Sequence, residues 1–151
     1  MRVSSTYVRT LLENGEMEQV NRFLGHPHLL TGEVVEGRQL GRTIGIPTAN
    51  MRIPEGVAVP KLGVYAGSTV VDGTVYMTVT NIGSRPTVGG HQVRMESWVL
   101  NFEGDLYGKP ITVALLKFLR EEKKFDSLEE LKAQILQDAD LVRKNYKKVS
   151  F

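Results

Sequence analysis

The stretch 41–50 combines the residue types that could hold a phosphate group together with its metal ion. It reads Gly-Arg-Thr-Ile-Gly-Ile-Pro-Thr-Ala-Asn. Its two glycines allow a backbone to approach a ligand closely, and Pro47 fixes a turn. The hydroxyl of Thr48 and the amide of Asn50 are oxygen donors of the kind that Mg2+ prefers. A metal–phosphate loop and a purely structural turn, in which Asn50 satisfies backbone groups, are equally compatible with these residues.

A second candidate is Glu96, an acidic residue in a largely apolar run. The apolar neighbours are Val93, Met95, Trp98 and Val99. A carboxylate that faces a cleft there could act as a general base. The alternative is a strand residue that faces solvent or pairs with Arg94 or Arg85. Taken alone, this alternative is favoured, because most charged strand residues are exposed.

A third candidate is the charged segment 118–126, which carries an aromatic side chain, Phe125, near its end. Its charges are typical of a solvated loop. Phe125 could pack against the helix that follows, as a hydrophobic staple, or it could offer a flat surface to a planar ligand. The spacing alone favours the staple.

Strands expected between residues 29 and 119 would position these candidates. They are predicted at 31–35, 64–71, 74–80, 93–102 and 111–119. Asp72-Gly73 is a strong hairpin signal between the second and third. In the fourth, Val93, Met95, Ser97 and Val99 fall on one side, and Arg94, Glu96, Trp98 and Leu100 fall on the other. Short strands joined by Gly-rich turns favour a closed barrel, because closure removes exposed edges.

Helices are expected at both ends of the chain. Residues 4–25 predict two short helices, separated at Asn14-Gly15. Residues 127–146 predict one amphipathic helix, with Ser127 as N-cap and Glu130 completing a capping box. The residues of its expected apolar stripe are Leu128, Leu131, Ile135, Leu136, Ala139 and Val142.

Composition limits the classes of protein to consider. The chain has 151 residues, of which 41% are hydrophobic, which suits a single barrel domain with helices outside it. A net charge of +2 is too mild to indicate a nucleic-acid partner. The sequence contains no cysteine, which excludes disulfides, thiol catalysis and zinc–thiolate sites. It has no apolar run long enough for a membrane span and no signal-peptide region, so we expect a cytoplasmic protein.

The stretch 41–50 resembles the signature of the riboflavin kinase family, Gly-Arg-x-x-Gly-x-Pro-Thr-Ala-Asn. Further segments are similar to the family in the same order along the chain. They are 63–67, 81–87, 95–97, 105–108 and 119–128. The resemblance covers residues 29–140, which are nearly all of the expected barrel and the last helix.

The resemblance implies a closed six-stranded antiparallel Greek-key barrel with a long C-terminal helix and short N-terminal helices. It also implies transfer of the γ-phosphoryl group of ATP to the 5′-hydroxyl of riboflavin, giving FMN and ADP with Mg2+. Thr48 and Asn50 match the residues that hold Mg2+ and the phosphates, and Glu96 matches the carboxylate that accepts the ribityl hydroxyl proton. The other positions that match ATP contacts are Gly37 and Arg42 at the phosphates, and Val99, Asn101 and Tyr107 beside the base. The positions that match flavin contacts are Arg120, Lys123 and Phe125.

The N-terminal residues 4–9 resemble the signature that closes the adenylyltransferase half of bacterial bifunctional riboflavin kinase/FMN adenylyltransferases, the FAD synthetases. The resemblance implies that residues 1–25 are a helical remnant or linker from that domain and that residues 26–151 are the kinase domain. We therefore expect a link to an adenylyltransferase domain in the full-length protein. The chain alone should not convert FMN to FAD. The sequence leaves the oligomeric state open.

The chain departs from the family pattern at three places. Ser97-Trp98 stands where Thr-His is common, Asn101 replaces a more variable polar position, and Glu121 stands where Pro is frequent. None of these removes a group that phosphoryl transfer needs. Two alternatives remain beside the kinase: a flavin- or nucleotide-binding module without catalysis, and an interaction domain that binds a protein through its C-terminal helix.

Overall fold

The computed structural model describes residues 10–11, 13–24, 28–35, 48–53, 59–104 and 106–145. The elements in chain order are α2 (Met17–Leu24), β1 (His28–Glu33), β2 (Thr48–Arg52), β3 (Gly63–Val71), β4 (Thr74–Thr87), β5 (Gly90–Val99), β6 (Pro110–Arg120) and α4 (Leu128–Asn145). The sheet has six strands in the order β1-β6-β3-β4-β5-β2. Each pair of neighbouring strands is antiparallel.

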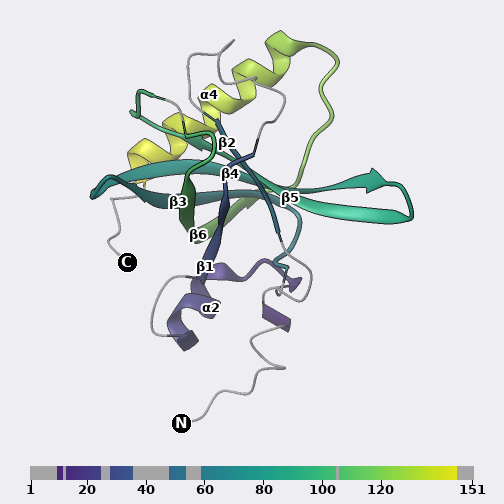
Figure 1. Cartoon of the computed structure of the whole chain (residues 1–151), viewed down its shortest axis with the longest axis horizontal. Helices are drawn as coiled ribbons and strands as arrows, with labels where there is room; N and C mark the ends of the chain where they lie inside the picture. Colours follow the sequence, from purple (N-terminus) through teal and green to yellow (C-terminus); the bar gives the residue numbers. More distant parts are fainter. Residues whose placement is uncertain are drawn as a thin grey trace.

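The sheet curls into a nearly closed barrel, as the sequence predicted (Figure 1). Its edge strands β1 and β2 come together, and an isolated bridge pairs Val35 with Asn50. Strands β3, β4 and β5 follow one another as neighbours, and β6 returns to lie beside β3. This arrangement is a Greek key. The hairpin between β3 and β4 turns at Asp72 and Gly73, whose φ angles of 50° and 82° suit a two-residue primed turn.

Strand β2 corrects the sequence-based expectation of a loop through residues 48–50. Ala49 and Met51 are buried, whereas Thr48 and Asn50 are half-buried. This alternation is that of a strand with one face toward the barrel core. Because β2 is short and directly follows a Gly- and Pro-containing stretch, its local sequence resembles a turn. Its pairing with β5 makes it a strand.

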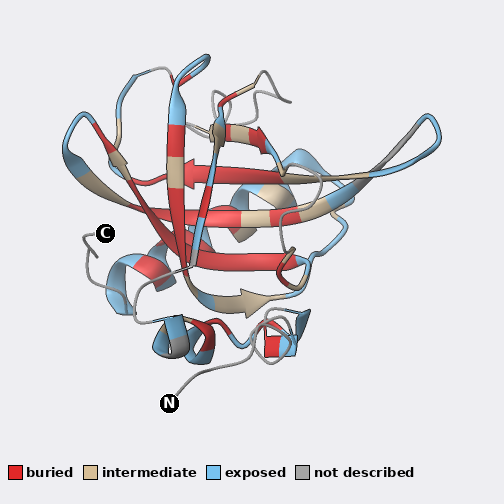
Figure 2. Ribbon diagram, turned by 60° about the horizontal axis from the view of Figure 1, so that its bottom comes forward, coloured by how far each residue is buried: buried red, intermediate tan, exposed pale blue. Residues whose placement is uncertain are grey.

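The strands separate two hydrophobic clusters. The inner cluster fills the barrel and includes Met95 and Val99 of β5. The outer cluster lies between the sheet and α4 and includes Trp98 of β5 and Leu100, which directly follows the strand. The alternation predicted for Val93 to Leu100 is therefore confirmed, but the strand ends at Val99 and not at residue 102 as predicted. Figure 2 shows the buried central parts of the strands between exposed turns.

Helix α4 begins with the predicted N-cap at Ser127, whereas Glu130 accepts from the residue before that cap. The amide N–H of Glu130 donates to Ser127 Oγ at 3.2 Å, and the N–H of Asp126 donates to Glu130 Oε2 at 3.2 Å. The predicted apolar stripe is right at Ile135, Ala139 and Val142, which are buried in the outer cluster.

The prediction of the apolar stripe is wrong at two leucines. Leu128 and Leu136 are 46% and 41% exposed. Leu136 lies about 100° around the helix from Ile135 and so leaves the buried face. A carboxylate, Asp138, is buried on that face at 4% exposure.

The N-terminal helix α2 packs against β6 and β1. Its Met17 and Val20, with Leu11 before it, belong to the inner cluster. Asn21 Nδ2 donates to the carbonyl oxygen of Leu115 at 2.9 Å. Gly15, with φ of 74°, ends the preceding turn where the sequence predicted a break. The described part of the N-terminal segment is thus continuous with the barrel core.

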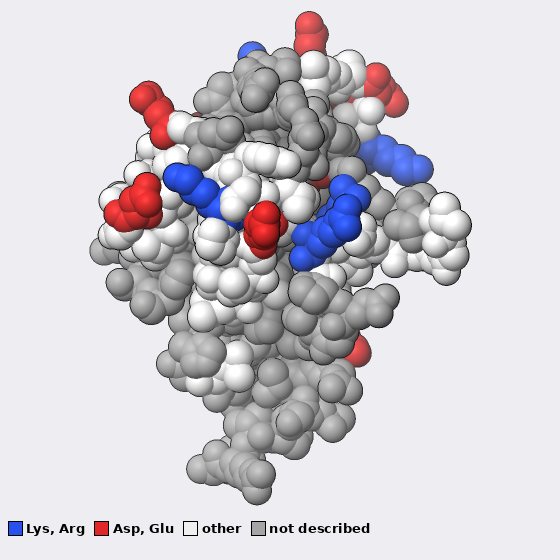
Figure 3. All heavy atoms as spheres, in the orientation of Figure 1, with Lys and Arg blue, Asp and Glu red and all other residues white. Residues whose placement is uncertain are grey.

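The surface carries charges of both signs. On the face shown in Figure 3, basic and acidic side chains of the described residues are interspersed rather than gathered by sign. No helix among the described residues is both long enough and apolar enough to cross a membrane.

Candidate functional site

A row of directly paired residues crosses the sheet on the side that faces α4. Asn50 pairs with Glu96, and Glu96 pairs on its other side with Asn81. Asn81 pairs with Val64, and Val64 pairs with Arg120. Paired residues in antiparallel strands project from the same face. Since Val64 belongs to the cluster under α4, the whole row faces that way.

One end of this row gathers oxygen donors. Thr48 lies two positions before Asn50 and therefore on the same face of β2, where it pairs with Trp98. Directly opposed residues hold their Cβ atoms about 5 Å apart, so Asn50 and Glu96 are neighbours. Glu96 is 6% exposed, which rules out the solvent-facing alternative. A hydroxyl, an amide oxygen and a carboxylate on one face form a donor set that fits Mg2+.

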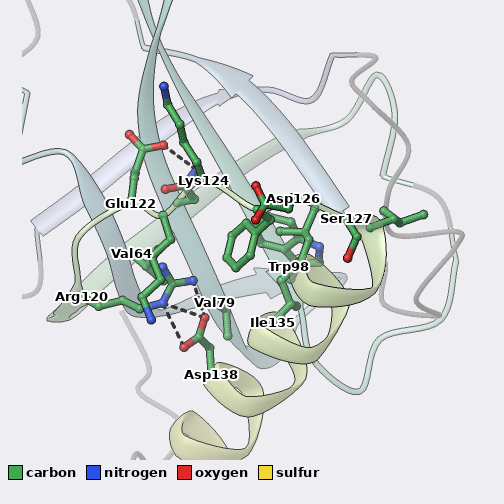
Figure 4. Close-up of a pocket in the computed structure, with 15 residues that line it drawn as sticks. Val64, Val79, Trp98, Arg120, Glu122, Lys124, Asp126, Ser127, Ile135 and Asp138 are labelled. Carbon is green, nitrogen blue, oxygen red and sulfur yellow. Dashed lines mark hydrogen bonds and ion pairs between the residues drawn. The ribbon is translucent and has the colours of Figure 1, made fainter.

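The other end of the row opens into a cavity of about 610 Å³ between the sheet and α4. Its floor includes Val64, Val79 and Trp98 from the sheet, and α4 contributes Leu131, Ile135 and Asp138. The segment 122–128 forms a further wall (Figure 4). A cavity of this size suits a small organic ligand.

The three residues expected at a flavin all line this cavity. Arg120 ends β6, and Lys123 and Phe125 lie in the connection to α4. Phe125 is half-buried and Lys123 is exposed, with Nζ donating to Gln134 Oε1 at 3.4 Å. Asn81 also lines the cavity and is the direct neighbour of Glu96. The cavity therefore adjoins Glu96 through Asn81, although Thr48, Asn50 and Glu96 are not among the described residues that line it.

Arg120 is fixed by a partner that the sequence analysis missed. Its Nη2 lies 2.8 Å from Asp138 Oδ2, and the side chains are 18% and 5% exposed (Figure 4). Its Nε donates to both carboxylate oxygens at 3.2 Å, and its Nη1 donates to the carbonyl oxygen of Glu121 at 3.0 Å. Gln134 Nε2 donates to Asp138 Oδ1 at 3.0 Å. All three guanidinium nitrogens are thus engaged within the protein, and Arg120 is held as a wall of the cavity.

The sequence did contain a signal for Asp138. It lies three positions after Ile135 and four before Val142, so it occupies the apolar stripe of α4. A carboxylate at such a position needs a partner when the helix packs. Arg120, on a different element, supplies it.

The remaining predicted residues lie away from the cavity or outside the described residues. Gly37 and Arg42 fall in the latter group. Val99 is fully buried in the inner cluster, on the face of β5 opposite to Glu96, so a ligand could meet only its backbone.

Asn101 and Tyr107 are exposed residues between β5 and β6. Neither is among the described residues that line the cavity. Asn101 has a φ of 62°, and its Oδ1 accepts from Arg143 Nη2 at 3.4 Å.

The matching family model and the curated relatives agree on one family. The model of the family Flavokinase: Riboflavin kinase matches residues 24–146. The bifunctional riboflavin kinase/FMN adenylyltransferase of Escherichia coli (strain K12) is 45% identical over 139 residues, which cover 91% of this chain. The chain spans less than half the length of such curated relatives, 44% of those from Bacillus subtilis and Escherichia coli.

Two solved structures are similar in fold. The crystal structure of a macrolide-efflux protein from Streptococcus pneumoniae has a TM-score of 0.87 at 32% identity, covering 97% of this chain and 48% of that chain. The crystal structure of riboflavin kinase from Trypanosoma brucei has a TM-score of 0.52 at 27% identity, covering 77% of each chain. The first similarity extends over nearly all of the chain, including its N-terminal segment.

Proposed function

Since the chain belongs to the riboflavin kinase family, we propose that its barrel transfers the γ-phosphoryl group of ATP to the 5′-hydroxyl of riboflavin, giving FMN and ADP. The observation that carries this proposal is the pairing of Asn50 with Glu96 beside the cavity under α4. It puts the Asn50 amide and the buried Glu96 carboxylate on one face, next to a cavity large enough for a flavin.

Glu96 has the role of proton acceptor in this proposal. The 5′-oxygen of riboflavin forms a bond to the γ-phosphorus while the bond from that phosphorus to the β–γ bridging oxygen breaks. The hydroxyl proton passes to the Glu96 carboxylate, and ADP leaves. Transfer of this kind needs alignment and charge neutralisation more than covalent catalysis. The burial of Glu96 in a strand provides the fixed position.

Thr48 and Asn50 would hold Mg2+ with the phosphates. The ion, when bound, neutralises charge on the phosphoryl oxygens. Gly37 and Arg42 are proposed to line the phosphates, where a guanidinium would add positive charge. Val99, Asn101 and Tyr107 are proposed to lie beside the base, Val99 through its backbone.

The cavity under α4 is the proposed flavin site. Arg120, Lys123 and Phe125 line it. Its sheet side is apolar at Val64 and Val79, which suits the broad face of an isoalloxazine ring. Helix α4 and the segment before it cover this side of the sheet and would exclude water from the reacting groups.

We also propose that residues 1–25 connect the kinase, residues 26–151, to an adenylyltransferase domain. The curated relatives carry both activities in their names and are more than twice as long as the match. We propose that this protein carries out the reaction in the cytoplasm. The chain alone would stop at FMN.

The test is to incubate the purified chain with riboflavin and Mg-ATP and to separate the flavins by chromatography. The proposal requires FMN and ADP in equal amounts, and their loss when EDTA removes the metal. Riboflavin bound without any FMN formed would instead identify a binding module without catalysis. Failure of riboflavin, ADP and Mg2+ to raise the thermal unfolding midpoint would favour an interaction domain.

A further inference from the structure

Two buried polar atoms in the lining of the cavity have no hydrogen-bond partner within the described residues. They are Trp98 Nε1, a donor, and Asn81 Oδ1, an acceptor. Trp98 is only 4% exposed, so water does not readily replace the missing partner. Buried polar groups are nearly always paired in folded proteins, because leaving one unpaired is costly. Both residues line the cavity, so a ligand that binds in it could supply the missing partners.

The orientation of the Asn81 amide is set by Glu122. Asn81 Nδ2 donates to Glu122 Oε2 at 3.4 Å. A carboxylate oxygen can only accept, so the NH2 group must face Glu122 and the carbonyl oxygen must face away. The unpartnered atom of Asn81 is therefore an acceptor.

Both residues flank Glu96. Asn81 pairs directly with Glu96 across β4 and β5. Trp98 follows Glu96 by two positions on β5 and projects from the same face. In the proposed function the reacting hydroxyl lies at Glu96, so these two side chains are the cavity-lining neighbours of that hydroxyl.

We propose that Asn81 Oδ1 and Trp98 Nε1 bind hydroxyl groups of the ribityl chain of the flavin substrate. Each hydroxyl both donates and accepts, so one polyol chain can satisfy an acceptor and a donor together. The two contacts hold the chain so that its terminal hydroxyl stays beside Glu96. This inference rests on the proposed function and adds the residues that recognise the sugar-like part of the substrate.

The experiment compares two flavins by calorimetric titration. Riboflavin carries the ribityl chain, and lumiflavin has a methyl group in its place. Asn81→Leu and Trp98→Phe each remove one hydrogen-bonding atom. Each should weaken riboflavin binding about three- to tenfold, the scale of one neutral hydrogen bond. Lumiflavin binding should weaken less than riboflavin binding in each variant, because any change in ring packing affects both flavins and the lost hydrogen bond affects riboflavin alone.

Ser68→Ala is the matched control. Ser68 Oγ is also buried without a partner, but it is not among the described residues that line the cavity. Its removal should leave both flavin affinities unchanged. Thermal unfolding identifies any variant that does not fold. If Trp98→Phe does not fold, Asn81→Leu by itself tests the inference.

An equal loss of affinity for riboflavin and lumiflavin would overturn the inference, because the effect would then come from the ring or from packing. Unchanged riboflavin affinity in both variants would overturn it as well. Formation of FMN by the wild type decides the proposed function separately. If the wild type forms FMN but the variants do not lose affinity for riboflavin selectively, the proposed roles of Asn81 and Trp98 are wrong and the proposed function stands.

Discussion

Asn50 and Glu96 are directly paired in the antiparallel ladder between β2 and β5. Their side chains leave the same face of the sheet, although the residues lie far apart in the sequence. The ladder fixes their relative position more firmly than two loops could. The ladder thereby holds beside each other the amide proposed to bind Mg2+ and the carboxylate proposed to accept the hydroxyl proton.

Removal of the amide in Asn50→Ala should impair both nucleotide binding and turnover. Hydrogen bonds and metal contacts to charged groups contribute about 1.5–3 kcal/mol, so the Kd for ADP with Mg2+ should rise about ten- to hundredfold. Titration calorimetry with Mg-ADP measures this change, and Thr48→Ala should act in the same direction.

Arg52→Ala is the control for this prediction. Arg52 lies on the same face of β2 but is exposed, and it pairs with Arg94. Its removal should leave the Kd for Mg-ADP within about twofold. If Asn50→Ala and Arg52→Ala have equally small effects, Asn50 does not bind the nucleotide complex.

Most strands could be predicted because their signals are local. The Asp72-Gly73 turn and the alternation from Val93 to Leu100 each occupy a few consecutive residues, and both are confirmed. Strand β2 could not be predicted in the same way. Its five residues follow a turn-like stretch, and only pairing with β5 stabilises them as a strand.

Only some residues of the candidate site could be predicted from the sequence. The resemblance to the family singled out Thr48, Asn50 and Glu96, and the fold brings them to one face. Asp138 escaped prediction because a search for apolar residues passes over a carboxylate, and its partner Arg120 lies on another element. The proposed roles of Asn81 and Trp98 rest on unpaired buried atoms, which a sequence does not show.

Breaking the buried ion pair in Asp138→Asn should destabilise the protein. The Arg120 guanidinium would lose its charged partner in a largely buried position. Loss of one partner from a buried pair costs about 3–5 kcal/mol, and the partial exposure of Arg120 favours the lower value. Urea denaturation measures the change in the free energy of unfolding.

Asp140→Asn is the matched substitution on the same helix, at an exposed position. It should change the free energy of unfolding by less than about 0.5 kcal/mol. Equal effects of the two substitutions would show that the Arg120–Asp138 pair does not stabilise the wall of the cavity.

The N-terminal helix should contribute to the stability of the barrel. Met17 of α2 is 1% exposed in the inner cluster. Met17→Ala should therefore cost about 2–5 kcal/mol through lost burial and the cavity left behind. Gln19→Ala, on the exposed side of the same helix, should be nearly neutral. Thermal or urea unfolding compares them. Similar stability of both variants would mean that α2 is dispensable for the barrel.

The rate of FMN formation by Glu96→Gln, at saturating riboflavin and Mg-ATP, tests the central claim most directly. Loss of a general base lowers turnover by roughly 10²- to 10⁴-fold. The variant should show that decrease and keep the wild-type affinities for riboflavin and Mg-ADP, while the exposed Glu129→Gln on α4 should turn over normally. Turnover by Glu96→Gln close to that of the wild type would contradict the account.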